Sequence, residues 1–250
     1  MAAVKTGQKR RASQGGRSAA QAVAATGTAP RKGAAVRRQA TPAKTSGGGR
    51  QDRDALASRL IDEAGRILSS EGAGALTLRR LAAASGTSTM AVYTLFGDKT
   101  GLLAAMYREG FYRLGQASAQ AAAHTDDPLD ALASLGLAYR ATALANPHLY
   151  DLMFGRPIPT FAPDEETQAV AEAAYRPLVD AVQRCLDDDA LVTAHGIDDA
   201  ERIAFHLWAT SHGMVSLELA GHLDLGDAAA RERGYVEAMV LSSLPFLPTA

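Results

Sequence analysis

The sequence lacks most of the features that mark secreted, membrane-spanning and metal-binding proteins. It has a single cysteine, Cys185, which excludes an intrachain disulfide and a cysteine-based metal cluster and is usual for the reducing cytoplasm. No apolar run approaches the roughly 18 residues of a membrane-spanning helix. The N-terminus is basic but has no apolar segment after it, unlike a secretory signal. We therefore expect a cytoplasmic protein that has no membrane partner.

Acidic residues are missing altogether from the first fifth of the chain. Residues 1–50 contain 11 Lys and Arg and no Asp or Glu, whereas the remaining 200 residues contain 15 basic and 27 acidic side chains. The first segment also has too little apolar surface to offset the entropy lost on ordering it. We expect a disordered basic tail over residues 1–50. Binding to a polyanion, a solvated extension without a dedicated role and an overextended gene start are all open readings of it.

No window alternates polar and apolar residues over the length of a strand, whereas helical spacing recurs from residue 52 onward. Leu56, Leu60 and Ala64 begin the first amphipathic stripe, in a helix predicted from Asp52 to about Ser70. The predicted fold class is therefore all-α. Pro177 is expected to kink or split the helix that contains it. Later helices are expected to start at Asp98, after the turn at residues 126–128, at His148, at Asp164, at Asp198 or Asp199, and at Asp227.

Residues 76–103 are predicted to form two short helices joined by a glycine turn and followed at once by a longer helix. Thr77 and Ser88 are suited to cap the two short helices, and Gly86 permits the left-handed turn between them. This is the pattern of a helix-turn-helix, whose second helix enters the DNA major groove. The side chains assigned to its core are Leu81, Val92 and Phe96.

The string TLRRLAAASGTSTMAVYTLF at residues 77–96 and the GDKTGLL that follows it resemble the TetR family of bacterial transcriptional regulators. With the helix before them, the resemblance covers about residues 52–107. Three positions depart from the family pattern. Thr87 stands where Val is common, Leu95 where an aromatic residue is common, and Arg80 where an acid is common. Further along, NPHLYDLMFG and WATSHGMVSLELAG resemble a C-terminal domain type named for its Trp-His-Gly signature.

The resemblance implies an N-terminal three-helix helix-turn-helix DNA-binding domain, placed at residues 51–98. A larger helical domain at 99–250 would bind an effector and form a dimer. The family's usual dimer interface falls here on the predicted helices from Asp199 to Ala220 and from Asp227 to Leu244. The implied function is that of a homodimeric repressor. It would bind a palindromic operator in double-stranded DNA and be released by a small apolar effector.

Hydroxyl and ammonium groups near helix starts suit phosphate oxygens, and residues that open the recognition helix face base edges. Threonine hydroxyls can bond either kind of base, and a thioether suits the thymine methyl group. A merely solvated position remains an alternative for the arginines, and core packing for Tyr93. The candidate DNA-contacting residues are Thr77, Arg79, Arg80, Ser88, Thr89, Met90, Tyr93, Thr94 and Lys99.

By the same resemblance, the C-terminal domain is expected to hold a mostly apolar effector cavity. Its aromatic and sulfur side chains are candidates for the lining, and His212 and Tyr175 could supply polar groups. Ordinary core packing is the alternative for each residue taken alone. The candidate ligand-binding residues are Phe111, Tyr150, Met153, Phe154, Tyr175, Trp208 and His212.

No sequence motif points to catalysis. The chain has no HExxH, Gly-x-Ser-x-Gly or Walker loop, and Asp187-Asp188-Asp189 is better read as a solvated helix end than as a metal site. We therefore expect no catalytic residue, no metal and no cofactor. Two non-enzymatic alternatives stay open: an architectural protein that coats DNA through its basic tail, and a ligand-binding or adaptor protein whose DNA-binding head has lost activity.

Overall fold

The computed structural model describes residues 48–155, 157–194, 197, 199–223 and 225–248. Over these residues the chain is all-α, as predicted, with one isolated bridge between Ala194 and Ile197 as its only β pairing. The helices are α1 (Gly48–Glu71), α2 (Leu78–Ala84), α3 (Thr89–Phe96), α4 (Lys99–Ala122), α5 (Pro128–Ala145), α6 (Pro147–Tyr150), α7 (Glu165–Asp187), α8 (Ala200–Leu219) and α9 (Ala228–Ser243). A π-helical turn, Asp151–Gly155, follows α6, and a 3-10 turn, Leu244–Phe246, follows α9.

Seven of the predicted helix starts are confirmed by their caps. At each N-terminus that is capped by a side chain, an oxygen accepts a hydrogen bond from the backbone N–H three residues along, at 2.8–3.1 Å. This bond satisfies one of the N–H groups that a helix start leaves without a partner. Gly86 has the expected left-handed φ of 62° between α2 and α3. The capping residues are Thr77, Ser88, Asp98, Asp127, Asp164, Asp199 and Asp227.

Two expectations need correction. The first helix begins at Gly48 rather than Asp52, so the last residues of the predicted tail belong to α1, and the rest of that tail lies outside the described residues. Pro177 does not split its helix, because α7 runs unbroken from Glu165 to Asp187. A proline removes one backbone bond and its ring crowds the carbonyl four residues earlier, but packing of α7 against α4, α5 and α8 holds the helix together, and the alternative expectation of a kink is not tested by its continuity.

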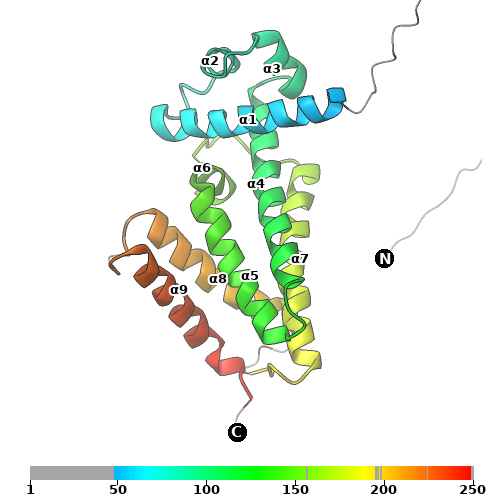
Figure 1. Cartoon of the computed structure of the whole chain (residues 1–250), viewed down its shortest axis with the longest axis vertical. Helices are drawn as coiled ribbons and strands as arrows, with labels where there is room; N and C mark the ends of the chain where they lie inside the picture. The colour runs from blue at the N-terminus through cyan, green and yellow to red at the C-terminus, as the bar shows by residue number, and fades with distance from the viewer. Residues whose placement is uncertain (1–47, 156, 195–196, 198, 224, 249–250) are drawn as a thin grey trace, which may run out of the picture. The chain divides into compact units, whose positions relative to one another are not determined.

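The first hydrophobic core joins α1–α3 to the start of α4. It buries Leu60, Leu81 and Val92 completely, and Phe96 packs against it half-buried. Leu149 and Leu152, from α6 and the π-helical turn, belong to the same core. The expected domain boundary at residues 98–99 therefore falls between helices that share one core. Figure 1 shows α1 lying across one end of α4, with α2 and α3 beyond it.

The rest of the chain packs around α4. Helices α5 and α7 lie along α4, α8 packs against α5 and α7, and α9 pairs with α8 (Figure 1). Two further cores fill this region, one between α7, α8 and the 3-10 turn, and one between α4, α5, the π-helical turn, α8 and α9. The second of these is rich in aromatic side chains and surrounds the cavity described below.

Candidate nucleic-acid interface and ligand cavity

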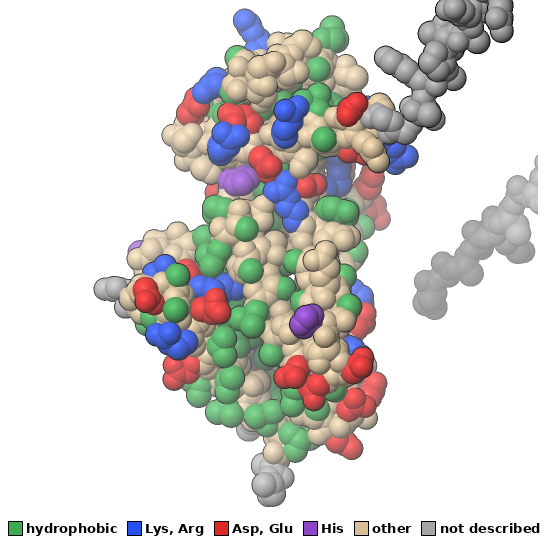
Figure 2. Space-filling model, viewed as in Figure 1, with side chains coloured by type: hydrophobic (Ala, Val, Ile, Leu, Met, Phe, Trp, Pro, Cys, Tyr) green, Lys and Arg blue, Asp and Glu red, His purple; other side chains and the backbone are tan. Residues whose placement is uncertain are grey.

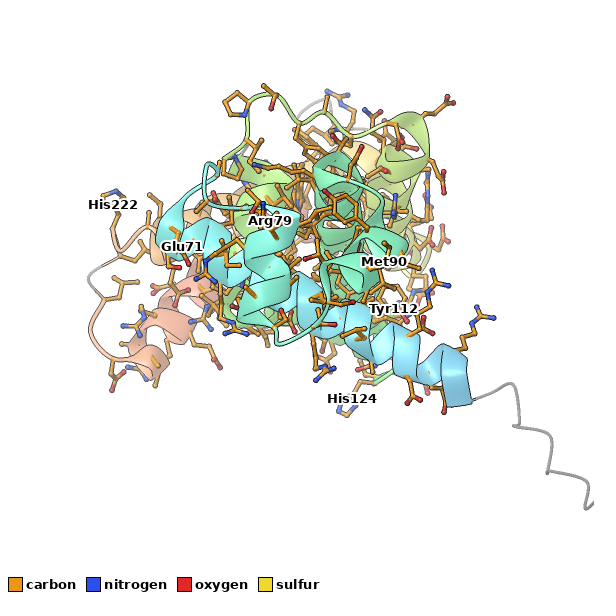
Figure 3. All side chains as sticks on the ribbon, turned by 90° about the horizontal axis from the view of Figure 1, so that it is seen from above. Glu71, Arg79, Met90, Tyr112, His124 and His222 are labelled. Atoms are coloured by element: carbon orange, nitrogen blue, oxygen red, sulfur yellow. The ribbon has the colours of Figure 1, made fainter. Side chains whose placement is uncertain are left out.

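Helix α3 is seated on the first core by Val92, which is fully buried, and presents its opposite side to solvent. Met90 is 74% exposed and Tyr93 is 49% exposed, which is unusual for side chains of this size and apolarity. In the view from above, Figure 3 labels Arg79 on α2 and Met90 on α3, the two helices that Figure 1 shows at one end of the molecule. The helix-turn-helix thus offers two adjacent helices with exposed groups that can donate hydrogen bonds or make apolar contacts.

Three of the predicted DNA-contacting side chains are engaged within the protein. The Arg80 guanidinium bonds the Glu71 carboxylate at 2.6 and 3.2 Å, and the pKa of Arg80 is raised, chiefly by that hydrogen bond. The Lys99 ammonium donates to the carbonyl of Ala73 at 2.7 Å. The Thr94 hydroxyl donates to the Met90 carbonyl at 2.8 Å. These contacts fix the turn between α1 and α2 and the geometry of α3, and any DNA contact must compete with them.

The other predicted DNA-contacting residues divide into two kinds. Arg79, Thr89 and Tyr93 make no side-chain hydrogen bond or ion pair with other described residues, and neither does Met90. Thr77 and Ser88 are exposed but use their oxygens to cap α2 and α3. Each cap hydroxyl keeps its proton for a further acceptor, since only its oxygen is used. Arg79 is the predicted cation that is not committed elsewhere.

Charge is divided unevenly between this end of the molecule and the rest. Residues 51–98 hold 5 basic and 6 acidic side chains, whereas residues 99–250 hold 10 basic and 21 acidic ones. Figure 2 shows basic and acidic side chains mixed over α1–α3, and a cluster of acidic side chains toward the opposite end of the molecule. The head is therefore close to neutral and the remainder is acidic, so a polyanion is repelled less at the head than elsewhere.

A cavity of about 540 Å³ lies among α4, α5, α7, α8 and α9. Five of the seven predicted ligand-binding residues line it: Phe111, Met153, Phe154, Tyr175 and Trp208. Their rings are in contact. Phe154 lies 5.6 Å from Phe111 between ring centroids, and Trp208 lies 5.9 Å from Tyr175. The volume and the mostly apolar lining are those of a small-molecule site.

The remaining two predicted residues, Tyr150 and His212, do not line this cavity. They stack on each other at 5.5 Å and are joined by a hydrogen bond of 2.7 Å between the tyrosine hydroxyl and Nδ1. Tyr139 completes the cluster through a 3.0 Å bond to the same nitrogen, and its ring faces the cavity. Because α5 and α8 meet here, His212 packs against Tyr139 and Tyr150 and does not face the cavity.

Burial keeps this cluster neutral. It raises the pKa of Tyr139 and of Tyr150, in each case mainly because the phenolate would lose its hydration, and for the same reason it lowers the pKa of His212. A neutral imidazole between two phenols satisfies hydrogen bonds without placing a charge beside the cavity. His212 therefore supports the wall and carries no charge to a ligand near neutral pH.

Several cavity residues were absent from the sequence-based set. Tyr139, Ser118, Ser211 and Tyr235 line the cavity and carry hydroxyl groups. A signal for Ser118 was present, because Tyr107, Phe111, Leu114 and Ser118 follow one another at helical spacing, and a hydroxyl on an otherwise apolar stripe is unusual. Ser211 likewise follows Leu207 on a buried stripe of α8.

The cavity opens to solvent at an apolar mouth. Leu129 and Leu137 on α5 and Val236 and Val240 on α9 line the cavity and are each at least 39% exposed. Figure 2 shows hydrophobic side chains gathered on this face over α5 and α9. An exposed cluster of this kind gives an apolar molecule a route into the cavity.

The segment Pro147–Gly155 connects the cavity to the first core. Met153 and Phe154 line the cavity, whereas Leu149 and Leu152 are buried with α1 and α4. Met153 also lies close to Gly110 of α4, where a Cβ would be in close contact with it. A ligand that displaced the π-helical turn would therefore also disturb the packing of Leu149 and Leu152 against the helix-turn-helix.

A buried ion pair ties α5 to α8 next to this region. Arg140 makes two hydrogen bonds of 2.8 Å with the Glu218 carboxylate, and both side chains are less than 10% exposed. The bond to Arg140 lowers the pKa of Glu218. Arg231 and Glu232 of α9 add contacts of 3.3 Å. The pair and these contacts fix α9 relative to α5 and α8.

The described residues hold no group of three or more His, Cys, Asp and Glu side chains that could bind a metal ion. Cys185 is buried, and burial raises the pKa of its thiol to about 11, so it remains a protonated core residue. Among the described residues, no helix is both long and apolar enough to cross a membrane.

Two family models match the chain. Residues 60–106 match the model described as bacterial regulatory proteins, tetR family, and residues 132–241 match the tetracyclin repressor-like C-terminal domain. The first match contains the second half of α1, all of α2 and α3, and the start of α4. The second contains much of the cavity wall, including Tyr175 and Trp208. Together they cover more than half of the chain.

Similar proteins occur among curated regulators and among solved structures. The HTH-type transcriptional regulator Rv1816 of Mycobacterium tuberculosis is 27% identical, over 69% of this chain and 84% of its own length. A solved protein of unknown function from Rhodococcus sp. RHA1 is 27% identical, with a TM-score of 0.62 over 75% of this chain and 95% of its own. The TetR family transcriptional regulator PfmR from Thermus thermophilus matches in fold, with 20% identity and a TM-score of 0.59 over 74% of this chain and 97% of its own.

Proposed function

The chain belongs to the TetR family of bacterial transcriptional regulators, and from this we propose that it is a homodimeric repressor that binds a palindromic operator and is released by a small apolar effector. It is a DNA-binding regulator by membership of the family. The dimer, the sign of regulation, the symmetry of the site and the nature of the effector are the parts that we propose. We further propose that it acts in the cytoplasm, where its DNA lies.

The exposed side of α3 supports major-groove recognition. Met90 and Thr89 open the helix, where the family's readers of base edges lie, and Tyr93 follows one turn later. A thioether suits a thymine methyl group, and threonine and tyrosine hydroxyls suit base or phosphate oxygens. We propose that Arg79 contacts phosphate, and that Arg80 and Lys99 act mainly through the bonds that hold the turn.

An apolar face on α8 and α9 supports dimerisation. On α8, Phe205 and Leu217 are exposed, with Ala209 and Gly213 between them at four-residue spacing, so a second helix can approach closely. Leu241 on α9 and Leu244, which begins the 3-10 turn after α9, are more than half exposed. A two-fold pair would cover these side chains and set two α3 helices at half-sites about 34–36 Å apart or a multiple of that spacing.

The main support for a ligand response is that the segment Pro147–Gly155 contributes both to the cavity and to the first core. The same short segment supplies Met153 and Phe154 to the cavity and Leu149 and Leu152 to the core that seats α3. A ligand that displaces the cavity side must shift or strain the other side, because packed cores do not deform continuously. A coupling of about 1–3 kcal/mol between ligand and DNA would be typical of such a link.

The experiment that tests DNA recognition is a selection of genomic fragments by the full-length protein at moderate salt, followed by sequencing. We expect an enriched palindrome, and protection of that site by a dimer. The matched variant Met90→Ala should change the recovered sequence, whereas Thr100→Ala, at an exposed position outside α3, should leave it unchanged. Failure to enrich any palindrome would contradict the proposal.

The dimer is tested separately. Leu241→Glu introduces a charge on the exposed face of α9 and should shift the protein to monomer in analytical ultracentrifugation, with loss of operator binding. Glu237→Gln, one turn earlier on an exposed position, is the control and should leave the mass unchanged. A monomeric wild-type protein that still binds the palindrome would refute the dimer.

An architectural DNA-coating protein is the alternative that a specific observation favours. The 11 basic residues of positions 1–50 contrast with a head that is close to neutral, so much of the electrostatic affinity for DNA could come from the tail. That function predicts little preference among sequences, and the same selection distinguishes it from a palindromic operator.

A further inference from the structure

One stripe of α4 runs the length of the cavity. Tyr107, Phe111, Leu114 and Ser118 line it at intervals of four, three and four residues, which places them on the same side of the helix. Eleven residues of α-helix extend over about 16 Å. The cavity is therefore elongated along α4, with its aromatic end near the π-helical turn and Ser118 toward the other end of the helix.

The lining carries almost no charge. Glu172 is the only Asp, Glu, Lys, Arg or His among the described residues that line the cavity, and it is exposed at the surface. An anionic ligand would therefore lie in the cavity without a cation, and an unpaired charge moved out of water is strongly disfavoured. The occupant has to be uncharged over the part that is buried.

Most of the hydroxyl groups around the cavity are already bonded within the protein. The Tyr235 hydroxyl donates to the Gly136 carbonyl and bonds Ser211, both at 2.7 Å. Tyr175 donates to the Glu201 carbonyl, and Ser243 to that of Val240. Tyr139 bonds His212, as described above. None of these groups needs a ligand to satisfy it.

Ser118 is the exception. Its side chain is 8% exposed, it lines the cavity, and its hydroxyl has no hydrogen-bond partner among the described residues. The other hydroxyl in this condition, that of Tyr107, belongs to a half-buried ring that solvent can reach. The hydroxyl is accessible from the cavity, so water can bond it there, and a ligand oxygen at this point would take the place of that water.

We propose that the cavity binds an elongated, uncharged hydrophobic molecule that ends in a hydroxyl or carbonyl oxygen, and that Ser118 recognises that oxygen. The inference rests on the proposed role of the cavity as the effector site. A serine hydroxyl both donates and accepts, so it pairs with an alcohol or with a ketone, aldehyde or ester. The aromatic and aliphatic walls hold the remainder of the molecule, and the apolar mouth between α5 and α9 admits it.

The protein carries its own reporter for this binding. Trp208 is the only tryptophan of the chain and lines the cavity, so its fluorescence responds to occupancy without a label. The probes are octan-1-ol, octan-2-one, octane, octanoate and octylammonium, titrated into the full-length protein. We expect the alcohol and the ketone to bind at least tenfold more tightly than either ion, and about tenfold more tightly than octane.

Substitution separates Ser118 from general packing. Ser118→Ala should abolish the preference for octan-1-ol over octane, a loss of about tenfold, while leaving octane binding unchanged. Ser243→Ala is the matched control, because it removes a cavity hydroxyl that already bonds Val240, and it should preserve the preference. A chain-length series from hexanol to decanol should gain about fourfold per methylene until the cavity is filled.

Three results would overturn the inference: octanoate binding as tightly as octan-1-ol, an alcohol preference that survives Ser118→Ala, or no response of Trp208 to any probe. None of these outcomes touches operator binding, which is measured on the same samples. Conversely, a protein that binds the alcohol through Ser118 but keeps its operator at saturating alcohol would support the ligand class and contradict release by an effector. The two proposals can therefore fail separately.

Discussion

The imidazole of His148 on α6 lies directly against the backbone of Gly65 on α1. A methyl group at Gly65 would overlap the ring, so the absence of a side chain is what allows the two helices to meet. Asp62, one turn earlier on α1, also faces this point and pairs with Arg113 of α4 at 2.9 Å. Arg113 in turn bonds Asn146, at the start of α6, at 2.6 Å. The contact therefore joins the DNA-binding head to the segment that borders the cavity.

Gly65→Ala should loosen this junction. We expect it to destabilise the fold by about 1–3 kcal/mol, because overpacking forces a shift of α6 or a strained histidine rotamer. That cost should lower the melting temperature by roughly 2–12 °C for a chain of this size. It should also weaken operator binding even without ligand. Differential scanning calorimetry and an operator titration measure the two effects.

Gly49→Ala provides the control for Gly65→Ala, since it makes the same change in the same helix at a position with open space. It should leave stability unchanged or slightly increased, because alanine favours helix over glycine. Equal effects of the two substitutions would show that helix propensity, and not the contact with His148, governs α1.

The Arg140–Glu218 pair should be costly to break from one side. Glu218→Gln leaves a buried guanidinium with only the exposed Glu232 at 3.3 Å, so we expect a loss of about 3 kcal/mol at neutral pH. Chemical denaturation measures the change in the free energy of unfolding. Glu237→Gln, an exposed glutamate of α9, should change it by less than about 0.5 kcal/mol.

The same pair gives a pH dependence of known sign. The folded-state pKa of Glu218 is lowered, so its contribution is complete above the ordinary glutamate value of 4.5 and is lost as the pH falls through the lowered pKa. The stability difference between the wild-type protein and Glu218→Gln should therefore shrink below pH 4.5. A difference that stays constant down to pH 3 would show that the ionised carboxylate is not what stabilises the pair.

Arg79 and Arg80 should differ in their effects on DNA binding although they are neighbours. Arg79 makes no ion pair with other described residues, whereas Arg80 is held by Glu71. We expect Arg79→Ala to weaken binding about equally across sequences and to reduce the salt dependence by about one unit of slope, as when one phosphate contact is removed. Fluorescence anisotropy with operator and scrambled DNA over a range of salt concentrations measures both quantities.

Arg80→Ala should instead lower the melting temperature slightly and leave the salt slope nearly unchanged, because an exposed ion pair contributes little to stability. Should Arg80→Ala reduce the slope as much as Arg79→Ala, then DNA displaces Glu71 from Arg80 in the complex. Equal slopes for Arg79→Ala and the wild-type protein would remove Arg79 from the set of phosphate contacts.

The features that could be predicted from the sequence are those decided by neighbouring residues. The caps at Thr77, Ser88 and Asp98 depend on a side chain and an N–H three residues away, and all three are present. The helical stripes and the glycine turn at Gly86 are local in the same sense. Local patterns of this kind are sufficient to predict both the helix-turn-helix and the all-α fold.

Features that depend on how distant segments meet were harder to predict. The hydrogen bond of Lys99 to Ala73 joins residues 26 positions apart in the sequence. It gives Lys99 a structural role, whereas its spacing in the sequence predicts a phosphate contact. His212 and Tyr150 meet only because α5, α6 and α8 converge, and that convergence turns them away from the cavity. The sequence shows Ser118 as a polar residue within an apolar stripe. Only the structure shows that this residue lines a cavity, where its hydroxyl can bond a ligand.

Removal of residues 1–47 tests how much of the DNA affinity is sequence-independent. The deletion removes 10 of the 11 basic residues of the tail and leaves α1 intact from Gly48. If the tail neutralises phosphates, the slope of log affinity against log salt should fall by up to about 0.9 for each phosphate that is no longer neutralised. Because such interactions read no bases, affinity for scrambled DNA should fall by the same factor as affinity for the operator. The ratio of the two affinities should therefore stay constant.

The control is a full-length chain in which the same 10 tail residues are replaced by glutamine, which keeps the length of the tail and removes its charge. It should match the deletion if charge is what matters. A deletion that leaves the salt slope unchanged would assign the electrostatic affinity to the head, where Arg79 is the side chain best placed to supply it. A deletion that abolishes operator binding but spares binding to scrambled DNA would contradict both readings, since charge alone cannot select a sequence.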